Sequence, residues 1–159
     1  MTQEPQCCPK FDPAYYNGKT HHWDKKNFVK ADVIQFMHIP LNMGSVIGKT
    51  WKIIDEAKAA QADKDFLILM YDPSPWKSEL YFTTTKKVEG ANNVTLSGEF
   101  YSKVFDGPYQ DVPKWYKAME NWANENKKTI KKQYFHYAYC PKCSNKYGHN
   151  YCVAFTQIA

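Results

Sequence analysis

Apolar and polar residues alternate from about residue 31 onward in a pattern that predicts regular secondary structure. Met43, Ile47 and Trp51 recur at the spacing of an α-helix that continues to about residue 60. Short apolar or alternating runs, which are typical of β-strands, lie at residues 33–39, 66–71 and 79–88. The first half of the chain therefore predicts the order strand, helix, strand, strand.

The second half of the chain repeats this order. The pattern predicts a strand at 94–104, a helix from Val112 to about Asn126, and strands at 134–139 and 151–158 with a loop between them. The two halves align with three identities: Pro40 on Pro108, Tyr71 on Tyr139 and Pro73 on Pro141. Because these identities coincide with the same element order, we predict an internal duplication with repeats 31–88 and 94–158.

Two such repeats predict an α+β fold. Duplicated β-α-β-β units that join edge to edge form one curved antiparallel sheet with two helices on one face. The other face is then a concave cleft between the halves, a place where ligand sites are common. Residues 1–30 show no sustained period and contain several prolines. We expect them to form an irregular N-terminal arm whose aromatic residues pack on the body, residues 31–159.

The composition narrows the range of functions. A chain of 159 residues that is 43% hydrophobic and 16% aromatic can bury the core of one domain, which excludes global disorder. All 21 basic residues are lysines, and arginine, the usual residue for bidentate contacts with guanine and phosphate, is absent. The net charge of +5 and the lysines at 127–132 therefore predict a solvated surface and no nucleic-acid partner.

The hydrophobic runs are all too short to cross a bilayer, which takes about 20 apolar residues. Residues 1–10 also lack the apolar segment of a secretory signal. We therefore expect a cytoplasmic protein without a membrane partner, and we leave a protein partner open.

Two short motifs carry a resemblance to a known family. One is KVFDGPY at residues 103–109, followed by an amphipathic helix, and the other is YDP at 71–73, followed by SELY at 78–81. With these motifs, residues 31–159 resemble the GyrI-like small-molecule-binding domain, which is also the effector-binding domain of multidrug-responsive regulators. The chain departs from the family at the cysteine-containing loop 140–149 and lacks the usual Thr-Glu pair at the last strand. No helix-turn-helix precedes the domain, so we do not expect the DNA-binding regulator itself.

Acidic and aromatic residues on two predicted strands are the main candidates for a site. Glu79 and Tyr81 share one strand face, as do Glu99 and Tyr101, because strand side chains repeat every two residues. Either carboxylate could equally be an ordinary residue on an outward face. The resemblance implies a cleft that binds flat, lipophilic and often cationic compounds, in which aromatic faces attract the cation and a carboxylate supplies the counter-charge. The candidate ligand-binding residues are Tyr71, Trp76, Glu79, Tyr81, Glu99, Tyr109, Tyr137 and Tyr139.

The resemblance supports two functions for the same cleft. The first is a stand-alone domain that binds a small lipophilic, planar or cationic organic molecule. The second is a hydrolase of small electrophiles, since some GyrI-like proteins open cyclopropane rings with a glutamate and a tyrosine. Glu79, Glu99 and Tyr101 are then the candidate catalytic residues, because a carboxyl group in an apolar cleft has a raised pKa that suits acid–base chemistry. Neither function requires a cofactor.

The cysteines suggest a further alternative, a zinc-stabilised interaction module. Cys140, Cys143, His149 and Cys152 form the spacing C-x2-C-x5-H-x2-C, which suits tetrahedral zinc coordination. Cys7 and Cys8 could reach the same place. The competing interpretation is a reduced cysteine pair in a turn with no metal. Five cysteines without a secretory signal do not favour a disulfide framework.

Overall fold

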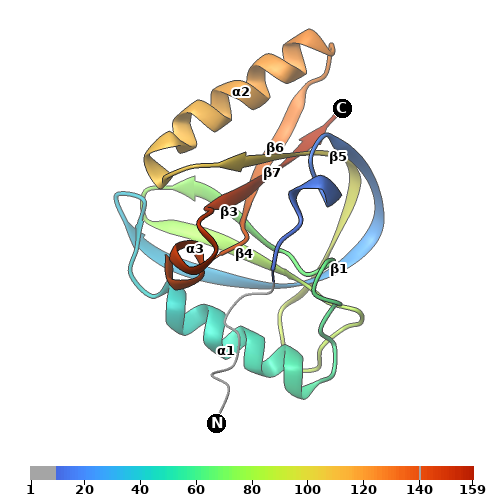
Figure 1. Ribbon diagram of the computed structural model, residues 1–159. Coiled ribbons are helices and arrows are strands. Elements are labelled where there is room, and N and C mark those ends of the chain that lie inside the picture. The colour runs from blue at the N-terminus through green and yellow to red at the C-terminus, as the bar shows by residue number, and fades with distance from the viewer. Residues whose placement is uncertain (1–9, 140) are drawn as a thin grey trace. The chain divides into compact units, whose positions relative to one another are not determined.

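The computed structural model describes residues 10–139 and 141–159, and their path is drawn in Figure 1. The described chain is built from antiparallel strands and α-helices, which confirms the predicted α+β class. It divides into two compact units. The first unit is residues 22–98, and the second unit is residues 99–159 together with the described residues up to His21. Among the described helices, none combines the length and apolarity that a membrane span requires.

The first unit has one helix and a small antiparallel sheet. Its elements are most of β1 (Lys19–Phe36), then β2 (Ile39–Pro40), α1 (Met43–Glu56), β3 (Ile68–Ser74) and β4 (Lys77–Thr83). β4 lies between β1 and β3 and pairs with both, while β2 pairs with the end of β1 in a hairpin. The order strand, helix, strand, strand is therefore the one that the periodicity predicted, with the short β2 added.

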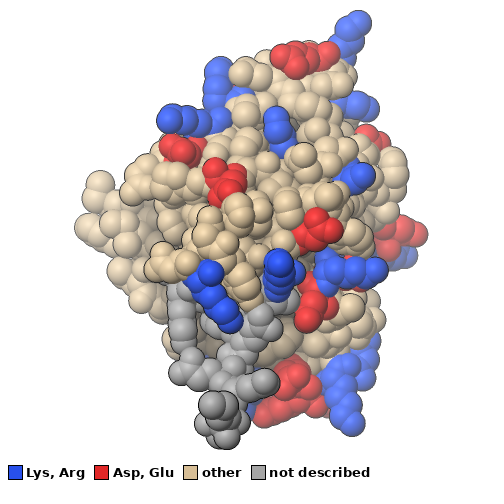
Figure 2. Space-filling model, in the orientation of Figure 1, with Lys and Arg blue, Asp and Glu red and all other residues tan. Residues whose placement is uncertain are grey.

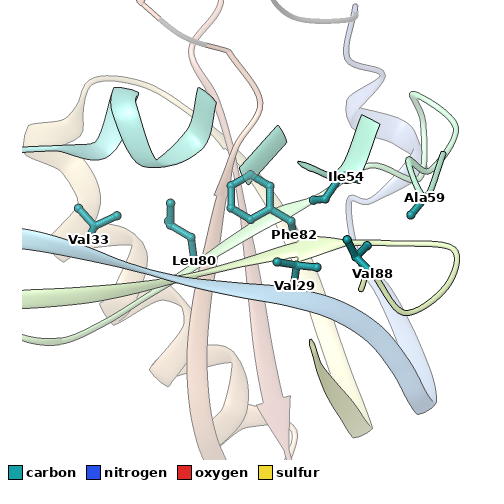
Figure 3. Close-up of a cluster of buried hydrophobic side chains, with 7 residues drawn as sticks. All are labelled: Val29, Val33, Ile54, Ala59, Leu80, Phe82 and Val88. Atoms are coloured by element: carbon teal, nitrogen blue, oxygen red, sulfur yellow. The ribbon is translucent and has the colours of Figure 1, made fainter. Parts of the chain in front are cut away.

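The core of the first unit lies between α1 and one face of this sheet. Leu80 and Phe82 alternate along β4, and Val29 and Val33 lie on β1, and all four pack in one cluster with Ile54 of α1 (Figure 3). Ile54 recurs at helical spacing after Ile47 and Trp51, as an amphipathic helix requires. Because side chains alternate along a strand, the residues between those core positions point to the opposite face.

The second unit has the same pairing order. Its elements are most of β5 (Asn93–Asp106), α2 (Val112–Glu125), β6 (Ile130–Tyr137), α3 (Pro141–Tyr147) and β7 (Tyr151–Ile158). β7 pairs antiparallel with both β5 and β6. Trp115 and Met119 of α2 are buried against Phe135, Cys152 and Ala154 of the sheet.

The alignment of the two halves does not extend to every element. The helices correspond, and the last strand is the central one in each unit. The linkers after the helices differ, however, because residues 57–67 separate α1 from β3 whereas residues 126–129 separate α2 from β6. As a result Tyr71 lies inside β3, while Tyr139 follows the end of β6. A duplication of the element order stays a prediction, and these strand bounds do not support the placement of Tyr71 on Tyr139.

Two boundaries differ from those that the sequence predicted. β1 begins at Lys19, so this strand extends into residues 1–30, which the sequence assigned to an irregular arm. Lys25 has a positive φ of 50° within β1, and such an irregularity shifts the alternation and hides the strand from a period-2 search. The second difference is α3, which occupies much of the segment predicted to be a loop. Its first residue is Pro141, at a position where a helix tolerates proline.

Truncation of Phe82 tests the core of the first unit. Phe82 is fully buried in this cluster, so Phe82→Ala removes buried apolar area and leaves a cavity, at an expected cost of about 3–5 kcal/mol in the free energy of unfolding. Ile53→Ala on α1 is the matched control, because Ile53 is 43% exposed, and its expected cost is below about 1 kcal/mol. Urea unfolding of both variants measures the two values. Equal costs would contradict the assignment of Phe82 to the core.

Candidate functional site

Glu79 and Tyr81 lie on the face of β4 that points away from α1. Their neighbours Leu80 and Phe82 face the helix, so the alternation of the strand places Glu79 and Tyr81 on the opposite side. The hydroxyl of Tyr81 donates a hydrogen bond to Oε2 of Glu79 at 3.3 Å. The structure therefore brings together the first acid–aromatic pair that the sequence predicted.

Lys30 is the third member of this polar group. Its Nζ lies 2.6 Å from Oε1 of Glu79, and the two side chains are only 23% and 15% exposed. The hydrogen bond to Glu79 raises the pKa of Lys30, with further help from the negative charges of Glu79 and Asp32, although desolvation opposes the shift. The sequence had predicted a carboxylate in apolar surroundings, whereas the structure supplies it with a cation. We refer to Lys30, Glu79 and Tyr81 as the Glu79 cluster.

Sequence reasoning missed Lys30 because it assigned residues up to 30 to an irregular arm. The signal was nevertheless present, since Val29 and Val33 are apolar while Lys30 and Asp32 between them are charged. In the register of the sheet, Lys30 lies opposite Tyr81 and Asp32 lies opposite Glu79. Residues that pair directly across strands share a face, which explains how Lys30 reaches the carboxylate.

Tyr71 and Trp76 occupy different places. Tyr71 pairs directly with Glu79 across β3 and β4, so it shares the face of the Glu79 cluster. Trp76 lies in the turn between these strands, is 58% exposed, and has its ring centroid 5.6 Å from that of Phe36. Tyr71 therefore belongs beside the carboxylate, while Trp76 belongs to the surface of the hairpin.

Glu99 and Tyr101 share a strand face, as predicted, but it is the face covered by α2. The ring of Tyr101 stacks on Trp122 of that helix with centroids 3.7 Å apart, and burial raises the pKa of its hydroxyl. Oε1 of Glu99 lies 3.7 Å from Nζ of Lys128, beyond the end of α2. The expectation that this pair lines a cleft opposite the helices is wrong, because alternation shows which residues share a face but not which face is buried under a helix.

The remaining predicted tyrosines, Tyr109, Tyr137 and Tyr139, lie in the second unit. Tyr109 and Tyr137 contact each other with ring centroids 5.1 Å apart, and Tyr137 packs against the α2 core. The Tyr139 hydroxyl accepts a hydrogen bond of 2.8 Å from the backbone N–H of Phe11. The ring of Tyr139 also lies near that of Tyr147. Tyr137 and Tyr139 therefore pack within the second unit, whereas Tyr109 is 53% exposed.

The N-terminal residues cover the face of the second unit that points away from α2. The ring centroid of Phe11 lies 5.4 Å from that of Tyr151, and that of Tyr16 lies 5.6 Å from that of Phe155. The hydroxyl of Ser102 on β5 donates a hydrogen bond of 2.6 Å to the carbonyl oxygen of Tyr16. In the second unit, these N-terminal residues therefore occupy the sheet face opposite α2. This face corresponds to the face of the first unit that carries the Glu79 cluster.

The predicted zinc ligands are not brought together among the described residues. Cys140 lies outside them, and the described residues contain no group of three or more His, Cys, Asp or Glu side chains arranged to hold a metal. Cys152 is fully buried in the α2 core, and burial raises the pKa of its thiol well above the usual value. This environment disfavours the thiolate that zinc requires. A structural zinc stays a prediction, and the zinc content of the purified protein is its direct test.

His149, a predicted zinc ligand, pairs instead with Asp106. Its Nδ1 lies 2.8 Å from Oδ2 of Asp106, and the N–H of Asn150 donates a bond of 2.9 Å to Oδ1. The imidazole stacks on Tyr151 with centroids 4.7 Å apart. The pair borders an open hollow of about 580 Å³, whose lining is Asp106, Gly107, Pro108, Tyr109, Ser144, Asn145, Gly148, His149 and Asn150. Sequence reasoning quoted Asp106 in a motif but gave it no role.

Comparison with known proteins places the chain in a family. A family model described as "Bacterial hydrolase" matches residues 1–158. The chain belongs to this bacterial hydrolase family. No curated protein matches it.

Solved structures similar to this bacterial hydrolase family member share its fold at low sequence identity. The C-terminal domain of EcmrR has a TM-score of 0.68 and 8% identity, covering 91% of this chain and 98% of that one. A hydrolase from Listeria innocua has a TM-score of 0.63 and 10% identity, covering 90% and 92%. SAV2435 bound to tetraphenylphosphonium has a TM-score of 0.53 and 11% identity, covering 90% and 94%. These similarities support the GyrI-like fold that the motifs implied.

The Asp106–His149 pair of this family member predicts a pH-dependent contribution to stability. Burial alone would raise the pKa of Asp106, but the hydrogen bonds from His149 and from the Asn150 N–H, with the charge of His149, lower it below the usual 3.8. A carboxyl group with a lower pKa in the folded state stabilises the protein above its unfolded pKa and loses this effect as the pH falls through the folded value. Asp106→Asn should therefore reduce stability near neutral pH, by at most about 1 kcal/mol because the pair is exposed.

Thermal unfolding from pH 7 downward measures this effect. The difference in Tm between wild type and Asp106→Asn should shrink as the pH falls below about 4, the usual pKa of aspartate. Asp63→Asn, in an exposed loop after α1, is the control and should show no such trend. A difference that stays constant down to low pH would show that the charge of Asp106 is not involved.

Proposed function

We propose that this protein binds a small lipophilic, planar or cationic organic molecule at the face of β1, β3 and β4 that points away from α1. The observation that carries the proposal is the largely buried carboxylate of Glu79, which is 15% exposed and flanked by Tyr81 and Tyr71. Tyrosine faces attract cations and stack on planar rings, and the carboxylate supplies the counter-charge. The shared fold with SAV2435, which was solved with the lipophilic cation tetraphenylphosphonium, supports this chemistry.

Lys30 is the group that a cationic ligand would replace beside Glu79. A carboxylate that is largely buried is costly unless a cation or hydrogen-bond donors satisfy it. In the unliganded protein Lys30 and the Tyr81 hydroxyl fill this role. A cationic ligand takes over from the Lys30 ammonium group, whose long, flexible stem lets it swing toward solvent. The binding face thus keeps its charge balance, and Lys30 competes with the ligand for Glu79.

Because of this exchange, substitutions of Glu79 and Lys30 should change the affinity for a cationic ligand in opposite directions. Glu79→Gln keeps the shape and removes the charge, so it should weaken tetraphenylphosphonium binding by about 10- to 150-fold, which corresponds to about 1.5–3 kcal/mol for a charge-assisted contact. Lys30→Met removes the competing cation and should strengthen the binding of the same compound. Isothermal titration calorimetry measures both, and triphenylphosphine oxide, a neutral aromatic compound of related outline, should respond far less to either change.

Glu99→Gln is the matched control, because Glu99 is a carboxylate with a lysine partner on the helix-covered side of the second unit. Its binding constant should equal that of the wild type. If Glu99→Gln abolishes binding while Glu79→Gln does not, the site belongs to the second unit. If neither substitution matters, stacking alone accounts for binding and the carboxylate has no role.

A hydrolase of small electrophiles is the second candidate, and the hydrogen bond between Tyr81 and Glu79 favours it. In the ring opening of an activated cyclopropane, Glu79 would accept a proton from water while the water oxygen bonds to a ring carbon. The strained carbon–carbon bond breaks, and its electron pair takes the proton of the Tyr81 hydroxyl. Proton transfer from Glu79 to the tyrosinate then restores both groups, so that the net reaction is the addition of one water molecule. The family description is consistent with this activity.

Mass spectrometry distinguishes the two candidates. A hydrolase should convert an activated cyclopropane into a product heavier by one water molecule, whereas a binder should return every ligand unchanged. Tyr81→Phe removes the proton donor and keeps the ring, so it should abolish turnover and leave binding within about threefold of the wild type, a difference below 1 kcal/mol. Turnover that survives in both Tyr81→Phe and Glu79→Gln would exclude this pair as the catalytic groups.

A further inference from the structure

The most unusual surface of the described chain is an apolar one at the hairpin of β1 and β2. Six large apolar side chains there are each 55–65% exposed, and they are Ile34, Phe36, Met37, Ile39, Leu41 and Trp76. We call this set the hairpin patch. In Figure 1 the hairpin is the light-blue loop at the left, and the corresponding margin in Figure 2 is formed by uncharged residues. All six residues belong to the first unit.

The backbone holds the hairpin patch in a defined shape. Met37 and His38 have φ values of 49° and 66°, and Phe36 pairs with Ile39 on either side of them. Two residues with positive φ form the type of tight turn that suits a β-hairpin, a role usually taken by Asn-Gly. A methionine in this conformation costs free energy and gains nothing by exposure to water. This placement is explained if the side chain of Met37 contacts another apolar surface.

Further contacts fix the hairpin to the turn between β3 and β4. The N–H of His38 donates a hydrogen bond of 2.9 Å to the carbonyl oxygen of Pro75, and its Nδ1 lies 2.9 Å from Oδ2 of Asp72. The rings of Phe36 and Trp76 meet across the two turns. The hairpin patch is therefore assembled before any partner arrives, so that little conformational entropy is lost on association.

The size of the hairpin patch suits association with a second copy of the chain. A whole aromatic side chain has roughly 150–250 Å² of surface, so six large side chains that are more than half exposed present on the order of 600 Å². This value is at the top of the roughly 300–600 Å² that monomers leave in their largest apolar patch. It approaches the roughly 800 Å² that each partner buries in a standard interface.

The charges around the hairpin patch favour a second copy over an anionic membrane. The lysine next to Trp76, Lys77, is paired with Asp32 at 3.4 Å, and His38 is paired with Asp72. This border lacks the excess of positive charge with which proteins select anionic lipid surfaces. An apolar patch with a balanced border can meet its own copy about a twofold axis without repulsion between like charges.

We propose that the hairpin patch is a homodimer interface, in which Phe36, Met37, Ile39 and Trp76 of one copy pack on the same side chains of a second copy. The proposal is independent of the Glu79 cluster, because none of the three residues of that cluster belongs to the hairpin patch.

Sedimentation equilibrium of the full chain over a range of concentrations tests the proposal. The wild type should associate to a dimer. Phe36→Lys and Ile39→Lys, made separately, should each weaken association at least about 100-fold. In a twofold dimer the introduced lysine of one copy would face the apolar patch of the other copy, and it would also lie near the lysine introduced there. Both residues are exposed, so each variant should retain the circular dichroism spectrum and the Tm of a folded protein. Ile53→Lys, at another exposed apolar position, is the control and should still dimerise.

Three results would overturn the proposal. The first is a wild type that is monomeric at the highest attainable concentration. A dimer that both hairpin variants leave unchanged would use another surface. Finally, a monomeric wild type that binds phosphatidylcholine–phosphatidylglycerol vesicles, with loss of this binding in Phe36→Lys, would assign the hairpin patch to a lipid surface.

Discussion

The packing of one amphipathic helix on one sheet face of each unit is the constraint on which the other features depend. Leu80 and Phe82 must face α1, and Trp115 and Met119 must find apolar partners on the sheet beneath α2. Once those positions are set, the alternation of each strand decides where every other side chain lies, since a shift by one residue would turn the apolar set toward solvent. The Glu79 cluster lies on the face of β4 that points away from α1, because the core with α1 occupies the other face.

The same constraint separates two carboxylates that look alike in the sequence. Glu79 is largely buried and has both a lysine and a tyrosine hydroxyl as partners, whereas Glu99 forms a more exposed ion pair on the side of α2. A largely buried charge needs such partners to offset the cost of its desolvation. A more exposed ion pair has little effect on the stability of the protein. Under the proposed function, Glu79 is therefore the position at which a change of charge should alter ligand binding, and Lys30 is its counterpart.

The high aromatic content serves several purposes at once. Tyr101 stacks on Trp122 under α2, and Phe11 and Tyr16 cover the opposite face of the second unit. Tyr81 and Tyr71 remain beside the carboxylate of the first unit. Phe36 and Trp76 form a rigid surface on a hairpin whose turn contains two residues of positive φ. Aromatic residues that have similar sequence contexts thus divide into core, cover, candidate site and exposed surface.

The sequence by itself determined the α+β class, the strand–helix–strand–strand order of each unit apart from the added β2 and α3, and the placement of Glu79 and Tyr81 on one strand face. These features follow from local periodicity, which neighbouring residues carry in their own pattern. The tertiary structure alone decided that α2 covers the face of Glu99 and Tyr101, that Lys30 reaches Glu79 from another strand, and that His149 pairs with Asp106. Each of these depends on the register between segments far apart in the chain, or on which face the helix covers, and neither quantity is encoded in the spacing of residues along a single strand.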